Sequence, residues 1–383
     1  MTQTLRPFTH LGDMPIETFL RDYWQKKPLL IRQALPNFES PLSADELAGL
    51  CLEDDVISRL IIETPQSTPF NSEWNVTHGP LPEDIFETLP ENYWSLLVQH
   101  VDQLSPEVNQ LLNLFRFIPN WRLDDVMISY APDKGGVGPH FDYYDVFLLQ
   151  GHGQRRWRLG QQCTSKSPML ANAPMKVLTE FDVQEDWVLN PGDILYVPPG
   201  LAHWGTAVGE SITYSVGFRA PSHQDIVLDF SQEVASKIEE DNRYQDQFLT
   251  ANKNAGEITG DAIEQLKHIL QTYMQDEQAL AQWLGKTMTQ LNPGMVDEAE
   301  NTIEPEEMAN TPFTLSPFAR ATFYRADSNS EAYIFINGEV YSGSLELANT
   351  LSNYLPIDWL SCSDTDKLIL ETLAQQYLLV SLT

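Results

Sequence analysis

The sequence predicts an α+β protein with a mainly β core, in which an antiparallel sandwich or barrel is flanked by helices. Between residues 122 and 220, short apolar or alternating runs are separated by Gly, Pro, Asp and Asn, a pattern typical of closely spaced antiparallel strands. On both sides of this segment, apolar residues recur at helical spacing. The 383 residues, 42% of them apolar, are enough for two or three domains with a buried core.

Before the β-rich segment, the pattern favours helices separated by short strands. Ser43 and Glu46 have the spacing of a capping box at the start of a helix. Ser105 and Pro106 likewise mark a helix start. In order, the expected elements are a helix over residues 15–24, a strand at KKPLLI, a helix after Ser43, a strand over residues 56–62 and a mostly helical stretch over residues 92–117.

The chain after residue 221 is expected to be helical and then to end in a small α+β domain. Apolar residues recur every three or four positions through residues 226–238 and 263–273. Asn337 and Gly338, within YIFINGEVYSG, suit the type I′ turn of a hairpin. The expected domains are an N-terminal region with the barrel at 1–221 (the barrel from about 92), a helical region at 222–291, an acidic linker at 292–312 and a C-terminal domain at 313–383.

Charge and cysteine content exclude several classes of protein. The net charge of −31 repels nucleic-acid phosphates and anionic membranes and attracts a basic partner, so direct nucleic-acid binding is not expected. Residues 313–383 hold only three basic residues, too few for a nucleic-acid footprint. Three widely spaced cysteines form no CxxC pair, which argues against a disulfide framework or a zinc ribbon and favours the cytoplasm. Neither a secretion signal nor a run of about 18 apolar residues is found, so no membrane association is expected.

Two separated motifs predict a metal site. His140 and Asp142, in GVGPHFDYYDVF, are two residues apart, so on a strand both side chains point to the same face. His203 follows in GDILYVPPGLAH, which has the cupin spacing G-x5-P-x-G-x2-H. An H-x-D pair alone is a weak signal, and its alternative is a solvated strand end. Together, in this order within the β-rich segment, the motifs supply the two histidines and one carboxylate of non-haem Fe(II) oxygenases.

On these motifs the chain resembles the JmjC-type 2-oxoglutarate oxygenases of the cupin superfamily, and among them the bacterial ribosomal oxygenases that hydroxylate an arginine of large-subunit ribosomal protein sixteen. The resemblance rests on YWQKKPLLI, WRLDDVMIS, GGVGPHFDYYDVFLLQ, RRWR, PGDILYVPPGLAHWG and YSVGFRAP. It implies a double-stranded β-helix (jelly-roll) JmjC domain that uses Fe(II), 2-oxoglutarate and O2. It also implies a helical dimerisation region, and hence a homodimer, and a winged-helix-like C-terminal domain.

The resemblance further implies a binding site for 2-oxoglutarate. Arg155, fifteen residues after the first histidine of the motif, matches the basic residue that holds the C5 carboxylate, for which arginine offers bidentate geometry. Strand parity places Arg155 and Trp157 on one face, and Arg156 and Arg158 on the other. Ser129, in DVMISY, matches the family's assisting hydroxyl, and an ordinary strand serine is the alternative.

A guanidinium that enters the site needs a carboxylate and an aromatic wall. The resemblance gives these roles to Asp125 and Tyr144, with Met127 lining the same channel. Asp124 and Asp145 are alternatives, and all five residues could be structural.

The sequence therefore predicts an Fe(II)- and 2-oxoglutarate-dependent dioxygenase. By the resemblance, it hydroxylates an arginine side chain of a basic large-subunit ribosomal protein while 2-oxoglutarate and O2 become succinate and CO2. The alternatives are another cupin metalloenzyme, namely a histidyl hydroxylase, a lysine demethylase or an isomerase, and a non-catalytic acidic ribosome-binding factor. The intact metal ligands and Arg155 argue against the last of these.

Overall fold

The computed structural model describes residues 5–66, 69–246, 254–291, 301–325 and 330–382. The chain divides into two units that are described separately below. Unit 1 comprises Met1–Ala220, Leu291–Ala319 and Leu373–Thr383, and unit 2 comprises Pro221–Gln290 and Arg320–Thr372. Within the described part of the chain, every helix is too short or too polar to span a lipid bilayer.

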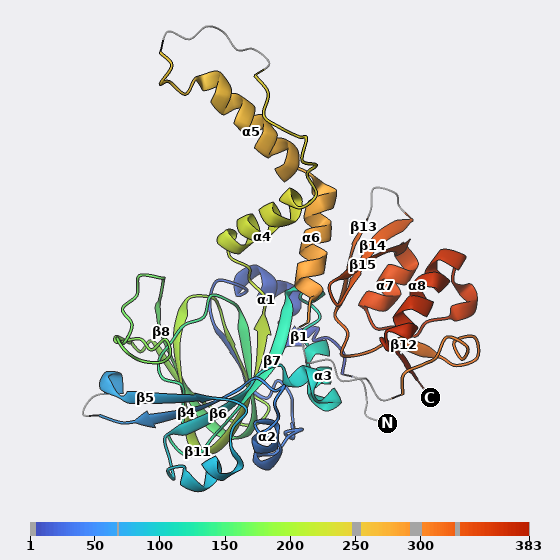
Figure 1. Cartoon of the computed structure of the whole chain (residues 1–383). Helices are drawn as coiled ribbons and strands as arrows, with labels where there is room; N and C mark the ends of the chain where they lie inside the picture. The colour runs from blue at the N-terminus through green and yellow to red at the C-terminus, as the bar shows by residue number, and fades with distance from the viewer. Residues whose placement is uncertain (1–4, 67–68, 247–253, 292–300, 326–329, 383) are drawn as a thin grey trace. The chain divides into compact units, whose positions relative to one another are not determined.

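A nine-stranded sheet dominates unit 1, and every strand pair in it is antiparallel. Its order is β3 (Leu29–Ile31), β10 (Ile194–Val197), β8 (Val146–Gln162), β11 (Leu201–Phe218), β7 (Leu123–Ala131), β6 (Trp94–Val98), β4 (Ser58–Thr64) and β5 (Glu73–His78), with β9 (Glu185–Leu189) also paired to β8. In Figure 1 these strands, coloured blue to yellow-green, curl into a barrel. The predicted antiparallel β core is confirmed, and strands that precede residue 92 also join this sheet.

The prediction of mostly helical structure over residues 92–117 is wrong in its first part. Residues 94–98 form strand β6, which pairs with β4 through Leu60 and Leu96 and with β7 through Leu96 and Tyr130. Short apolar runs such as SLLV suit a buried strand and a buried helix equally, so periodicity alone does not decide between them. The neighbouring strands decide, because β6 is covered on both sides by hydrogen-bonded partners.

The helices of unit 1 begin where the sequence predicts. The capping box of Ser43 and Glu46 opens α2, and Ser105 caps α3 with Pro106 in its first turn. The α-helices are α1 (Ile16–Asp22), α2 (Ala44–Leu50) and α3 (Pro106–Asn113). The 3-10 turns are η1 (Pro69–Asn71), η2 (Glu83–Thr88), η3 (Val101–Gln103) and η4 (Asn120–Arg122).

An aromatic core joins α1 to the outer face of the sheet. Phe19 of α1 is fully buried, with its ring 5.0 Å from that of Tyr196 and 5.7 Å from that of Phe147. Phe115, just after α3, lies 4.8 Å from Phe147 between ring centroids. Each such burial contributes about 1.5–3 kcal/mol. This core fixes one face of β8 and β10, leaving the opposite face of the strands to form the site.

Two further pairs complete unit 1: β1 (His10–Leu11) with β2 (Met14–Pro15), and β12 (Phe313–Leu315) with β16 (Leu379–Ser381). Of the expected acidic linker, residues 292–300 lie outside the described residues. From residue 301 the chain packs beside β16, since Ile303 and Met308 are buried and the Ile303 N–H donates to the Leu379 carbonyl at 3.1 Å.

Unit 2 contains a three-stranded sheet, with helices before and after it in the chain. Its elements are α4 (His223–Ala235), α5 (Gly260–Met274), α6 (Glu277–Thr289), β13 (Ala321–Arg325), β14 (Glu331–Ile336), β15 (Glu339–Ser344), α7 (Leu345–Ser352), η5 (Trp359–Ser361) and α8 (Asp364–Gln375), whose last residues fall in unit 1. The hairpin turn at Asn337 and Gly338 is confirmed by φ values of 50° and 88°. The winged-helix-like assignment stays a prediction.

Candidate metal centre and active site

Three predicted metal ligands lie together near the first residues of β11: His140, Asp142 and His203. The backbones of His140 and His203 form an antiparallel bridge, in which each N–H donates to the other's carbonyl at 3.0 and 2.8 Å. The two imidazole rings lie 4.2 Å apart. Oδ2 of Asp142 is 3.9 Å from Nε2 of His140 and 3.5 Å from Nε2 of His203. One ligand atom from each residue lies within 4.8 Å of the others, a spacing that suits one shared cation.

Hydrogen bonds to the backbone orient both imidazoles. Nδ1 of His140 is 3.0 Å from the Gly138 carbonyl, and Nδ1 of His203 is 3.0 Å from the Leu201 carbonyl. A carbonyl only accepts, so each Nδ1 carries the proton and each Nε2 offers a lone pair toward Asp142. Burial, and then the neighbouring His140, lower the pKa of His203 to about 4, so His203 is neutral at physiological pH. Neutral imidazoles and one carboxylate fit a divalent metal, with positions left open for other ligands.

Arg155 and Trp157 lie on the same inward face of β8, as parity predicts. Both are buried, whereas Arg156 is exposed and Arg158 half-buried. On β11, Ala207 pairs with Arg155, and His203 lies four residues before Ala207 on the same face.

The Arg155 guanidinium is buried, and no carboxylate of the described residues forms an ion pair with it. It is 2% exposed, and its Nε and Nη1 have no hydrogen-bond partner among the described residues. Burial lowers the pKa of Arg155 to about 10, which still leaves it positively charged at neutral pH. Burying a cation without a counter-ion destabilises the folded protein by several kcal/mol. An anionic ligand that pairs with the guanidinium is therefore strongly favoured. Room for the side chain comes from Gly205, where a Cβ would lie 2.7 Å from Arg155 Nε and 2.7 Å from the Trp157 ring.

Strand β7 brings three further predicted residues to one face. Asp125, Met127 and Ser129 alternate along it, while the residues between them are buried in the aromatic core. Ser129 is buried and pairs with Thr213 of β11. Asp125 is half-buried, and Nδ1 of His100 lies 3.3 Å from its Oδ2. The strand thus gathers a hydroxyl, a thioether and a carboxylate beside β11.

The two alternative carboxylates have structural partners. Asp124 accepts from Nε of Arg219 at 2.9 Å. Asp145 is fully buried, 3.2 Å from Nη2 of Arg122, and accepts from the Tyr196 hydroxyl at 2.7 Å. Burial raises the pKa of Asp145 in spite of these donors. Asp124 and Asp145 therefore each have an arginine partner, whereas Asp125 lies beside His100.

Tyr144 stands at the mouth of the site. The residue is 43% exposed, yet partial burial followed by the carboxylates of Asp142, Asp125 and Asp124 raise the pKa of its hydroxyl. The hydroxyl therefore stays protonated and can donate a hydrogen bond while the ring offers an aromatic wall.

His100 is a site residue that the sequence did not reveal. It lies 25 residues before Asp125 and in no motif, so the sequence pattern gives it no role. Its contact with Asp125 depends on a left-handed backbone conformation, with φ 54° and ψ 32°. The neighbouring sequence does not predict this conformation.

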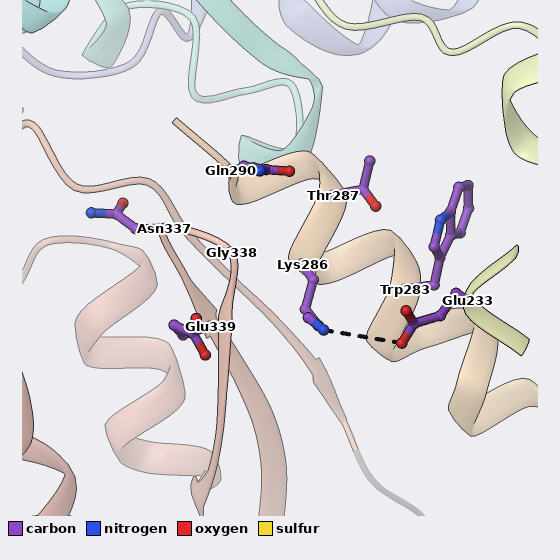
Figure 2. Close-up of a pocket in the computed structure, with 8 residues that line it drawn as sticks. All are labelled: Glu233, Trp283, Lys286, Thr287, Gln290, Asn337, Gly338 and Glu339. Carbon is purple, nitrogen blue, oxygen red and sulfur yellow. Dashed lines mark ion pairs between the residues drawn. The ribbon is translucent and has the colours of Figure 1, made fainter. Parts of the chain in front are cut away.

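A hollow lies wholly within unit 2. Its volume is about 340 Å³, and it is lined by Glu233, Trp283, Lys286, Thr287, Gln290, Asn337, Gly338 and Glu339. Figure 2 shows Lys286 and Glu233 facing each other across it, 4.0 Å apart. It holds neither histidine nor cysteine, and among the described residues the triad is the one group of three or more such side chains gathered for a metal.

Comparisons with known proteins point the same way. Residues 110–226 match the JmjC domain family. The chain is 38% identical over 275 residues to the ribosomal protein uL16 3-hydroxylase of Escherichia coli K12, which covers 71% of this chain and 70% of that protein. It is also similar to the X-ray structure of E. coli ycfD, with a TM-score of 0.83, 30% identity and 97% and 99% of the two chains covered. A structure of YcfD, a ribosomal oxygenase, with cobalt and 2-oxoglutarate matches with a TM-score of 0.80, 28% identity and coverage of 98% and 100%.

Proposed function

The chain belongs to the JmjC-domain ribosomal oxygenases, and on this basis we propose that it is an Fe(II)- and 2-oxoglutarate-dependent hydroxylase of an arginine side chain in a large-subunit ribosomal protein. The observation that supports the proposal most is a buried arginine, Arg155, whose Nε and Nη1 have no hydrogen-bond partner among the described residues and which lies on the same strand face as His203 of the metal-binding triad. An isomerase needs no such cation, whereas a dicarboxylic co-substrate requires one at its far end. The relative named a uL16 3-hydroxylase supports the choice of substrate.

His140, Asp142 and His203 would hold Fe(II), and Arg155 with the Ser129 hydroxyl would hold the C5 carboxylate of 2-oxoglutarate. When bound, the metal and 2-oxoglutarate supply the oxidation, in which 2-oxoglutarate and O2 become succinate and CO2 and one oxygen atom enters the arginine side chain. The chain's own part is orientation and exclusion of water. The apolar cluster around Trp157, Leu159 and Leu201 keeps the Arg155 side of the site dry.

Asp125, Tyr144 and Met127 would receive the substrate arginine. Asp125 supplies a carboxylate for the guanidinium, and the exposed ring of Tyr144 supplies a wall for its flat face. The net charge of −31 favours approach of a basic ribosomal protein and disfavours the RNA around it, so we expect no direct nucleic-acid binding.

A homodimer formed through the helical region 222–291 and a cytoplasmic location complete the proposal. Apolar side chains on α4 and α5, such as Val227, Leu228 and Leu270, are more than half exposed within one chain. Such a surface suits a self-complementary partner, and light scattering after size-exclusion chromatography tests it. Three free cysteines are in keeping with a reducing compartment.

The decisive test incubates ribosomal proteins with the protein, Fe(II) and 2-oxoglutarate, and analyses their peptides by mass spectrometry. We expect one arginine peptide to gain the mass of one oxygen, with succinate formed in equal amount. A lysine demethylase would instead lower the mass of its product, a histidyl hydroxylase would place the oxygen on histidine, and an isomerase would consume no O2. Ribosome binding without succinate formation would indicate a non-catalytic factor.

A further inference from the structure

His100 contacts the carboxylate of Asp125 through both its backbone and its imidazole. It lies between β6 and η3, with a backbone in the left-handed region that favours glycine or asparagine. Its N–H donates to Oδ2 of Asp125 at 3.1 Å, and its Nδ1 lies 3.3 Å from the same oxygen. Both side chains are mostly buried, at 14% and 13% exposed. A non-glycine residue in this conformation destabilises the folded protein by about 1 kcal/mol, and it is retained where the surrounding contacts hold it there.

The segment that carries His100 is fastened to β7 next to Asp125. Asp102 is fully buried, and its Oδ1 accepts the N–H of Val126 at 2.8 Å. The Asp102 carbonyl accepts from the amide of Asn109 at 2.9 Å, and its Oδ2 from the amide of Gln103 at 3.0 Å. Because Val126 follows Asp125 directly, these bonds fix the distance between His100 and the carboxylate it contacts.

The carboxylate of Asp125 faces a glycine, Gly217, of the neighbouring strand β11. Oδ1 lies 3.3 Å from the point that a Cβ at Gly217 of β11 would occupy. The adjacent carboxylate, Asp124, is held by Arg219.

We propose that His100 is a positioning residue, which orients Asp125 through Oδ2 so that the carboxylate is ready to receive the guanidinium of the substrate. The inference rests on the proposed function, in which Asp125 binds the substrate arginine. A carboxylate that is already ordered loses less conformational freedom when the ligand binds. His100 thus contributes to affinity for the peptide and not to binding of 2-oxoglutarate, which the proposed function assigns to Arg155 of β8 and Ser129 of β7.

Two substitutions of equal size separate this role from a structural one. Asn and Asp both tolerate the left-handed conformation. His100→Asn keeps a donor for Oδ2, whereas His100→Asp places an acceptor and a like charge there. We expect His100→Asp to raise the KM for the arginine peptide about tenfold or more, the loss of one charge-assisted hydrogen bond, and His100→Asn to stay within about threefold of the wild type. The KM for 2-oxoglutarate and its turnover without peptide should not change in either variant.

The exposed His152 of β8 provides the control, since His152→Asn should leave all these values unchanged. If His100→Asp does not fold, His100→Gly replaces it, because glycine suits the backbone and removes only the imidazole. An unchanged peptide KM in His100→Asp, or in His100→Gly where it replaces that variant, overturns the inference, as does an equal rise in both KM values or a failure of Asn to rescue. If the wild type hydroxylates no arginine peptide, the proposed function is wrong. If the wild type is active and the variants are unaffected, only the inference about His100 is wrong.

Discussion

Arg155 illustrates, at the scale of a single residue, how a binding site is maintained at a cost in stability. Its guanidinium is buried with Nε and Nη1 lacking a partner among the described residues. We predict that Arg155→Gln raises the KM for 2-oxoglutarate about 30-fold or more, as expected for about 2 kcal/mol from a lost charge-assisted pair. Without ligand, the same variant should unfold at an equal or higher temperature, because the unpaired charge is gone. Kinetics and thermal denaturation of the ligand-free protein check both parts, and a lower Tm with an unchanged KM would refute the assignment.

The sequence was sufficient for the residues that lie in compact motifs. His140, Asp142 and His203 are brought together as the two motifs predict, and Arg155 points inward as strand parity predicts. The contact of His100 with Asp125 is not predictable from the sequence, because it follows from a positive φ and from the docking of η3 on β7. Long-range contacts of this kind leave no periodic signature.

At the scale of elements, the turn that leads into β10 is held by one buried carboxylate. Asp193 is 1% exposed, and its Oδ1 accepts the N–H of Gln33 at 2.8 Å. Its Oδ2 accepts the N–H of Asn190 at 3.0 Å and Nη1 of Arg32 at 2.7 Å. Burial alone would raise the pKa of Asp193, but these donors together hold it below its ordinary value. The turn is therefore stabilised by the charged form of the carboxylate.

This gives a pH-dependent prediction for Asp193→Asn. Because the folded-state pKa is depressed, the stabilisation is fully present above the unfolded pKa of about 3.9 and is lost as the pH falls through the folded value. At neutral pH the variant should lose about 1–3 kcal/mol in free energy of unfolding, and the difference from the wild type should shrink below pH 4. Urea denaturation at several pH values measures it.

Asp186→Asn serves as the matched control for Asp193→Asn. Asp186 pairs with Arg156 on the outer face of the sheet, where both side chains are more exposed. An exposed pair contributes only about 0–1 kcal/mol. Equal effects of the two substitutions, or a gap that persists unchanged into acid, would show that the Asp193 charge does not stabilise the turn.

Elements whose signals are local were predicted, and those decided by neighbours were not. The capping box of Ser43 and Glu46 and the turn at Asn337 and Gly338 depend on adjacent residues, and both are found. The apolar run of β6 fits a helix as well as a strand, and the helical prediction there is wrong. Pairing with β4 and β7 on either side makes it a strand. Strands at residues 29–31 and 58–64 are expected from their apolar runs, but their pairing within the main sheet, and the strand at 73–78, are not, because the partners lie far apart in the sequence.

At the scale of the whole molecule, the net charge of −31 should govern capture of a basic substrate. We predict that raising the salt concentration from about 0.05 to 0.5 M increases the KM for the basic protein substrate, since the Debye length falls from over 10 Å to a few ångströms. The KM for 2-oxoglutarate should change much less, because Arg155 is buried and screened little by ions. Steady-state kinetics across the salt series measure both. A flat response for the protein substrate would mean that the acidic surface plays no part in its recognition.

The central claim is that the triad and Arg155 together support hydroxylation of an arginine side chain. The most direct measurement supplies isotope-labelled O2, Fe(II), 2-oxoglutarate and a ribosomal arginine peptide to the wild type and to Asp142→Ala. The wild type should place one labelled oxygen in the peptide for each succinate formed, and Asp142→Ala, which lacks one metal ligand, should place none. Labelled product from Asp142→Ala at the wild-type rate, or succinate without peptide oxidation from the wild type, would contradict the account.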